Sequence, residues 1–276
     1  MQIVPRYDGP PIVTLQGGAD VGQPFIRQRR RLQALLGSLS DDEWSAGSRC
    51  EGWTVQDVAA HLVGVNRFWH FSISAGLAGS ATRVLAGFDP KATPAAMVDA
   101  VRSAAPAETL AELVESNDAL CELVGELNDD QWSMIAEAPA GHLPIRLLVH
   151  HGLWDCWVHE RDIALPLGLA VAEDADEVLA CLRFVAALGP AFSLTSGSAT
   201  AAALVLETTE PDGCVVVEVT DHVAVHDRPP AEPTVVLRDA AVDLVEALSF
   251  RAPLTHAVPA DHRWLVVYLG EVFETI

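Results

Sequence analysis

The sequence is short of positive charge and of long apolar runs. It contains 38 Asp and Glu residues against 17 Lys and Arg residues, which gives a formal net charge of −21, and Lys91 is its single lysine. Nucleic acids and anionic membranes attract basic surfaces, so this deficit argues against both as partners. A small anionic substrate would need only a local positive site. No run reaches the roughly 18 consecutive apolar residues that a membrane-spanning helix requires, so we expect no membrane span.

Paired cysteines and a secretory leader are also lacking. The five cysteines are odd in number, widely spaced and without a CxxC motif, at Cys50, Cys121, Cys156, Cys181 and Cys214. This pattern predicts free thiols rather than a disulfide framework or a thiolate zinc site. Residues 1–22 do not combine a basic start with an apolar core, as a secretory signal would. We therefore expect a cytoplasmic protein.

Apolar residues recur at helical spacing in the first two thirds of the chain. They predict helices over about 24–39, 54–69, 106–127, 144–164 and 174–188, and a Gly- and Ala-rich loop after the second. Thr54 with Asp57, and Ser40 with Glu43, have the spacing of helix N-terminal capping pairs. Residues 35–44 (LLGSLSDDEW) resemble residues 123–132 (LVGELNDDQW), and a histidine-bearing helix follows each copy. This repeat predicts two similar helix pairs packed as a four-helix bundle.

The last third of the chain changes to a strand pattern. Four short, β-branched segments lie at 201–207, 214–220, 222–227 and 234–237, with proline-containing breaks at 211–213 and 229–230, and they predict antiparallel strands. A helical segment follows at 240–250, and 264–273 is ambiguous between helix and strand. The predicted organisation is an irregular lead-in at 1–23, a helical bundle at 24–190 and a small α+β domain with an antiparallel sheet at 191–276.

The chemistry-bearing residues gather on two of the predicted helices. His151, Asp155 and His159 are spaced i, i+4, i+8, so they share one face of the fourth helix. His61 lies in the apolar stripe of the second helix, where a histidine on its own is most often a core residue. Together His61, Asp155 and His159 make a set of two histidines and one carboxylate that suits a divalent ion. Zinc is the first choice, with iron, nickel or manganese as alternatives. The competing interpretation is a solvated polar face on which Asp and His simply pair.

Two motifs resemble those of the mycothiol-dependent maleylpyruvate isomerase family. They are CEGWTVQDVAAHL at residues 50–62 and WVHERDIA at residues 157–164. The resemblance implies an N-terminal DinB-like four-helix bundle whose metal ligands here are His61, Asp155 and His159. Asp155 stands where the isomerase itself usually has Glu, so this carboxylate is one methylene shorter. Residues 197–199, the strands, 239–251 and the ending at 264–273 are similar to the family's sterol-carrier-like C-terminal domain.

The same resemblance implies a chemistry. The family uses the thiol mycothiol at a divalent metal, for cis-trans isomerisation or for thiol transfer to a small electrophile, which could be a carboxylate. His151 is a candidate general base or partner of the ligands. Arg251 is a candidate for binding a substrate carboxylate, because the family often has an Arg-Pro-like turn there. The cysteine of the first motif, Cys50, is interpreted as structural.

Two other functions fit the same residues. A hydrolase or lyase on the same bundle would use the metal without a thiol, and a carrier protein would bind a small apolar ligand without turnover. A fold supports many chemistries, so the resemblance does not choose among them. No heptad seam lies on an outer helix face, and we expect a monomer or a weak dimer.

Overall fold

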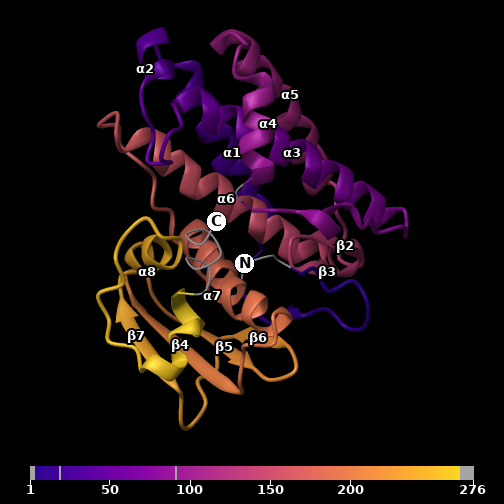
Figure 1. Cartoon of the computed structure of the whole chain (residues 1–276), viewed down its shortest axis with the longest axis vertical. Coiled ribbons are helices and arrows are strands. Elements are labelled where there is room, and N and C mark those ends of the chain that lie inside the picture. Colours follow the sequence, from indigo (N-terminus) through magenta and orange to yellow (C-terminus); the bar gives the residue numbers. More distant parts are fainter. Residues whose placement is uncertain (1–3, 19, 91, 268–276) are drawn as a thin grey trace.

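Four long helices pack side by side in the upper half of the molecule (Figure 1). The computed structural model describes residues 4–18, 20–90 and 92–267. The four helices are α1 (Gly22–Gly37), α3 (Val55–Leu77), α5 (Pro106–Gly125) and α6 (Ile145–Ala164). Each packs against two of the others, in the cyclic order α1, α5, α3, α6. Four of the five helical segments predicted from apolar spacing therefore form a bundle.

The two copies of the sequence repeat form matching turns at the ends of α1 and α5. After α1, Ser40 caps the short α2 (Asp41–Ser45) with Glu43 in a reciprocal capping box. After α5, the amides and side chains of Asn128 and Gln131 are hydrogen-bonded reciprocally at the start of η2 (Gln131–Ser133). The tryptophan that ends each copy of the repeat is buried. The repeat thus sets the entry to the next element of the bundle in both halves.

Four elements of the helical part, two helical and two strands, were not expected from the sequence. The predicted Gly- and Ala-rich loop contains η1 (Val84–Gly87) and a helix, α4 (Ala92–Val101). Pro94 fits α4 because it lies in the first turn, where the amide needs no acceptor within the helix. A hairpin of β2 (Ile135–Ala138) and β3 (Gly141–Pro144) precedes α6. Each strand has four residues, which is too short for an alternating apolar pattern to be recognised in the sequence.

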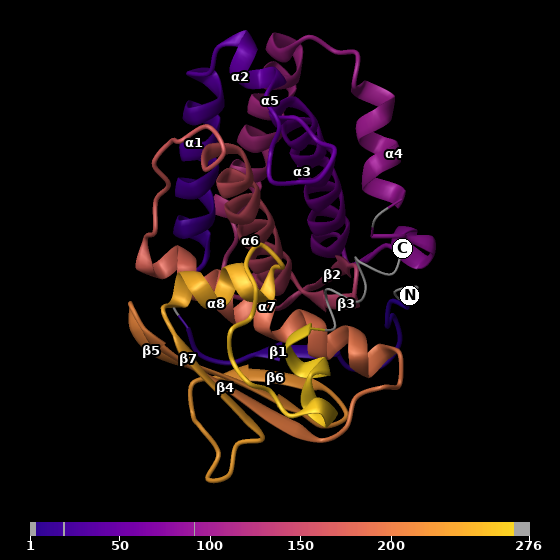
Figure 2. The ribbon, with the colours of Figure 1, turned by 60° about the vertical axis from the view of Figure 1, so that its left-hand side comes forward.

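A five-stranded mixed sheet forms the lower part of the molecule, in the order β1-β6-β5-β4-β7 (Figures 1 and 2). Its strands are β1 (Val13–Leu15), β4 (Ala202–Thr209), β5 (Asp212–Val219), β6 (Val223–His226) and β7 (Val235–Asp239). The prediction of a wholly antiparallel sheet was wrong at both edges, because β1 is parallel to β6 and β7 is parallel to β4. Only β4, β5 and β6 form the expected antiparallel meander. β1 comes from the segment interpreted as an irregular lead-in, and local patterns carry no information on such long-range pairing.

Helices α7 (Ala175–Thr195) and α8 (Ala241–Leu248) lie between the bundle and the sheet, as Figure 2 shows. α7 packs on α6 on one side and on α8, β5 and β6 on the other. It is the one described helix that is long and apolar enough to cross a membrane, yet 78% of its most apolar window is buried in the fold. It is therefore the central core helix. It also crosses the domain boundary placed at residue 190, and that boundary stays a prediction.

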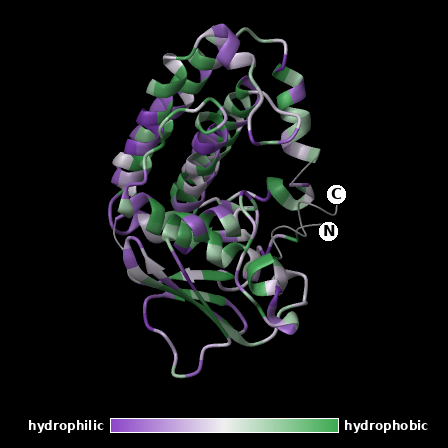
Figure 3. Cartoon of the chain, turned by 90° about the vertical axis from the view of Figure 1, so that its left-hand side faces the viewer, coloured by the Kyte–Doolittle hydropathy of each residue, from purple (hydrophilic) through white to green (hydrophobic). Residues whose placement is uncertain are grey.

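One large apolar core joins the bundle to the sheet. It runs from Phe25 in α1 through α6 and α7 to the strands and to Leu265. In Figure 3 the strands and the helices that cover them are mostly green, the colour of apolar residues. A smaller second core, around Trp44 and Leu62, packs α1, α2, α3 and α6 together at one end of the bundle. Of the ambiguous ending at 264–273, residues 268–273 lie outside the described part.

Candidate metal centre

Helices α3 and α6 bring His61, Asp155 and His159 to one point. Nε2 of His159 lies 3.6 Å from Oδ1 of Asp155, and Nε2 of His61 lies 3.9 Å from Oδ2 of the same carboxylate. One ligand atom from each of the three residues lies within 4.8 Å of the other two. The Asp155–His159 pair is fixed by one helical turn of α6, whereas the approach of His61 depends on how α3 packs against α6.

The donor set fits a divalent ion. Oδ2 of Asp155 is buried and has no hydrogen-bond partner among the described residues, which is costly for a carboxylate oxygen. Ligands of a tetrahedral zinc ion lie about 2.0–2.2 Å from the metal and hence roughly 3.3 Å from one another. The two histidine–carboxylate separations, 3.6 and 3.9 Å, exceed that value by 0.3 and 0.6 Å, and all three ligand atoms lie within 4.8 Å of one another. His61, Asp155 and His159 are therefore residues that could hold a metal, with further coordination positions open.

The three side chains are mostly enclosed, with exposed fractions of 11% to 16%. Burial raises the pKa of Asp155, but the neighbouring His61 and His159 outweigh that effect and hold the pKa well below its ordinary value. Burial lowers the pKa of His159, but its contacts with Asp162 and Cys50 have the larger effect and hold the pKa well above its ordinary value. A buried anion beside two imidazoles is the electrostatic environment that a cation favours.

The other nitrogen of His159 is held by Asp162, one turn further along α6. Nδ1 of His159 lies 3.0 Å from Oδ2 of Asp162, whose side chain is fully buried. Asp162 also accepts hydrogen bonds from Arg251 at 2.8 Å, from Arg49 at 3.0 Å and from the thiol of Cys50 at 3.2 Å. Burial raises the pKa of Asp162, but these donors hold it far below its ordinary range. In metal sites, a carboxylate on the outer nitrogen of a histidine fixes its tautomer and orientation.

The N-terminal half of the chain matches a known protein family. The family described as "Mycothiol maleylpyruvate isomerase N-terminal domain" matches residues 25–164, which are 140 of the 276 residues. The chain belongs to this mycothiol-dependent maleylpyruvate isomerase family. The matched range begins in α1 and ends with α6, so it contains all three candidate metal ligands.

Two solved structures share the fold of this maleylpyruvate isomerase family member. One is the mycothiol-dependent maleylpyruvate isomerase, with 18% identity, and the other is a histidine-to-alanine mutant of that enzyme, with 17%. In both comparisons the TM-score is 0.60, and the match covers 87% of this chain and 95% of the other. At these identities the likeness establishes the fold. No curated protein matches the chain.

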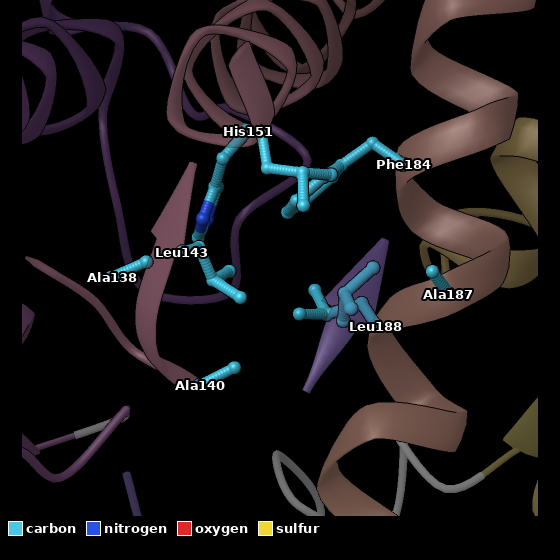
Figure 4. Close-up of a pocket in the computed structure, with 9 residues that line it drawn as sticks. Ala138, Ala140, Leu143, His151, Phe184, Ala187 and Leu188 are labelled. Atoms are coloured by element: carbon cyan, nitrogen blue, oxygen red, sulfur yellow. The ribbon is translucent and has the colours of Figure 1, made fainter. Parts of the chain in front are cut away.

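His151 of this family member shares the α6 face with Asp155 but points into a separate cavity. Figure 4 shows its imidazole between Leu143 of the β2–β3 hairpin and Phe184 of α7. Its ring stacks on Phe184 with centroids 4.6 Å apart and lies 4.7 Å from the ring of Trp69. Burial lowers the pKa of His151 to about 4, so the imidazole is neutral near pH 7.

Arg251 comes close to the centre through Asp162 rather than through a ligand. Its Nε and Nη2 both contact the Asp162 carboxylate, Nη2 also lies 3.5 Å from Sγ of Cys50, and Nη1 donates to the backbone oxygen of Ser249. All three guanidinium nitrogens thus have protein partners. The expected contact with a substrate carboxylate stays a prediction.

Sequence reasoning did not assign Asp162, Arg49 or the position of Cys50 to the site. Cys50, His159 and Asp162 form a second group with metal-ligand spacing. Asp162 is already neutralised there by two arginines and bonded to the thiol, so this group serves as support for His159. The available signal was the spacing of His159 and Asp162, which are three residues apart on α6 and so share a face.

Proposed function

We propose that this protein is a divalent-metal-dependent enzyme that uses mycothiol to act on a small electrophilic substrate, by cis-trans isomerisation or by thiol transfer. The observation that carries the proposal is the convergence of His61, Asp155 and His159, in which the buried Oδ2 of Asp155 has no hydrogen-bond partner among the described residues. Membership of the maleylpyruvate isomerase family supports the use of mycothiol. Zinc suits the donor set best, with iron, nickel or manganese as alternatives.

The residues of the chain have separate tasks in this proposal. His61, Asp155 and His159 hold the cation, and Asp162 keeps Nδ1 of His159 protonated so that Nε2 faces the metal. When bound, a divalent cation supplies Lewis acidity and stabilises a thiolate near neutral pH. The role of His151 as general base or partner of the ligands stays a proposal, and two observations oppose it. Its imidazole faces the cavity beside Leu143 and Phe184, and burial lowers its pKa to about 4, which makes it a weak base.

The substrate side of the proposal is a small molecule, which could be a carboxylate, with no nucleic acid or membrane involved. The excess of acidic residues means that a dianion would need local arginines to offset repulsion. We further propose a cytoplasmic monomer or weak dimer, on the basis of the free cysteines and the absence of a heptad seam.

The first experiment measures metal and activity together. Untagged protein is reconstituted with zinc, iron, nickel or manganese, and its metal content is measured by mass spectrometry. The expected result is near one equivalent in the parent and almost none in His159→Ala, with maleylpyruvate turnover only when both metal and mycothiol are present. His70→Ala is the matched control, since His70 lies on α3 and lines a different cavity, near Asn66 and Ser116.

The same experiment separates the other functions. Metal-dependent turnover of an ester or amide without mycothiol would favour the hydrolase alternative. The carrier alternative gains no support from the cavity under His151, whose volume of about 10 Å³ has room for roughly one water molecule. A parent protein that binds none of the four metals would overturn the proposed enzyme.

A further inference from the structure

The carboxylate of Asp162 is the meeting point of two parts of the chain. It lies on α6 of the bundle and accepts from Nδ1 of His159 on the same helix. It also accepts two hydrogen bonds from Arg251, which follows α8 and lies 89 residues further along the chain. A carboxylate with no exposed surface needs such partners, and the bidentate arginine fixes its plane as well as its charge.

Arg251 is itself held in place. Its side chain is 24% exposed, and its two carboxylate contacts are both 2.8 Å long. Burial lowers the pKa of Arg251, but the hydrogen bonds to Asp162 outweigh that effect and hold the pKa above its ordinary value. A guanidinium fixed in this way can orient Asp162 without itself reaching a substrate.

A second ion-pair cluster anchors the same connection. Arg49, in the loop before α3, bridges Asp162 and Glu246 of α8, with contacts of 3.0, 2.8 and 3.1 Å. Arg161 of α6 reaches Glu246 at 2.6 Å, but in the described part of the chain its guanidinium makes no hydrogen bond with the Asp162 carboxylate. Glu246 is nearly buried, so α8 is tied to the bundle directly beside the candidate metal centre.

We infer that Asp162 and Arg251 are positioning residues, which fix the tautomer and orientation of His159 so that the segment after α8 completes the metal centre. The inference rests on the proposed metal site and assigns Arg251 a task other than substrate binding. It predicts that removing Arg251 weakens metal binding even when no substrate is present. A structural ion pair alone would change only stability.

The test measures metal binding by the full-length protein, with zinc and cobalt(II) as probes. Zinc affinity is measured by competition with a chromophoric chelator, and the cobalt site by its visible d–d absorption. We expect Arg251→Met and Asp162→Asn to weaken zinc binding by about 10- to 100-fold, the usual cost of losing an outer partner of a ligand, and to shift the cobalt bands. Arg251→Lys should recover part of the affinity, because an ammonium group can still contact one carboxylate oxygen.

Arg161→Met is the matched control. It removes a buried arginine from the same cluster but leaves Asp162 untouched, so it should lower the melting temperature without changing zinc affinity or the cobalt spectrum. If Arg251→Met folds too poorly to measure, Arg251→Lys carries the comparison.

The outcomes distinguish this inference from the proposed function. Parental zinc affinity and cobalt spectrum in the Arg251 variants, with a lowered melting temperature like that of Arg161→Met, would overturn the inference and leave the metal enzyme intact. Unchanged metal binding with lost turnover in the Arg251 variants would also overturn the inference, and would favour substrate binding as the role of Arg251. A parent that binds neither metal would overturn both.

Discussion

Arg251 and Asp162 form a bidentate ion pair in which Nε–Oδ1 and Nη2–Oδ2 are both 2.8 Å. The pair joins the segment after α8 to the helix that carries two of the candidate metal ligands. Its position next to His159 means that the geometry of the centre depends on the C-terminal part as well as on the bundle. The family match ends at residue 164, so Asp162 lies within the matched range and Arg251 lies outside it.

The charge of Asp155, rather than its shape, should determine metal binding. Asp155→Asn keeps the volume but removes the anion that His61 and His159 face, and we expect metal affinity to fall by more than about 100-fold, beyond the cost of losing an outer partner. Asp155→Glu should retain the metal, because it keeps the donor type that is usual in the isomerase. Chelator competition measures both, with the exposed Asp118→Asn on α5 as control. Equal affinity in Asp155→Asn would remove Asp155 from the ligand set.

Two arginines of α1 should respond oppositely to replacement by methionine. Arg29 is fully buried, contacts Asn66 and a backbone oxygen, and has Nε and Nη1 without a partner among the described residues. Its guanidinium lies over the ring of Phe25 but forms no ion pair among the described residues. We expect Arg29→Met to leave the free energy of unfolding unchanged or to raise it by up to about 2 kcal/mol, since an apolar side chain removes a buried charge that has no carboxylate partner.

Arg31 pairs with Glu160 and Glu177, which are almost completely buried. Arg31→Met would leave these carboxylates with fewer partners and should lower the free energy of unfolding by about 2 kcal/mol or more. Urea unfolding at pH 7.5 measures both variants. A larger loss in Arg29→Met than in Arg31→Met would contradict the comparison.

His150 should make the protein less stable in mild acid. Burial lowers the pKa of His150 to about 4, although its contact with the Arg146 backbone oxygen opposes the shift. In the unfolded chain the ordinary pKa is about 6.5, so the unfolded state binds the proton first as the pH falls. The stabilisation is complete above pH 6.5 and is lost as the pH falls to about 4, up to about 3.5 kcal/mol at 1.4 kcal/mol per unit.

The variant His150→Asn keeps an amide donor near the Arg146 oxygen but has no titrating ring. Urea unfolding between pH 8 and pH 4 should show a shallower loss of stability in the variant than in the parent, and parallel curves above pH 7. Identical pH dependence in both proteins would show that His150 does not contribute.

Gly141 should not tolerate a side chain. Its φ is +116°, and an added Cβ would overlap the backbone of Arg6, which bridges to the β2–β3 hairpin. Gly141→Ala should lower the free energy of unfolding by about 1–3 kcal/mol and loosen the segment around Tyr7, whose hydroxyl donates to Glu137. Thermal unfolding and limited proteolysis measure these effects. Gly37→Ala is the control, because its Cβ would meet open space and should cost nothing.

The sequence by itself determined the local structure of this protein. Helical spacing placed α1, α3, α5, α6 and α7, and the capping pair Thr54–Asp57 marked the start of α3. The Asp155–His159 pair was readable for the same reason, since one helical turn puts residues four apart on one face whatever the rest of the fold does. These features depend on neighbours within a few residues along the chain.

Only the tertiary structure decided which distant segments meet. It paired β1 with β6 and β7 with β4, brought His61 against α6, turned His151 into a separate cavity and placed Arg251 on Asp162. The strand pairings and the helix packing depend on burial of apolar surface across the whole core. The ion pair of Arg251 and Asp162 forms because the buried carboxylate cannot be solvated by water. No local pattern records such a sum, so the candidate metal centre takes His61 and the contact from Arg251 from segments far along the chain from Asp155 and His159.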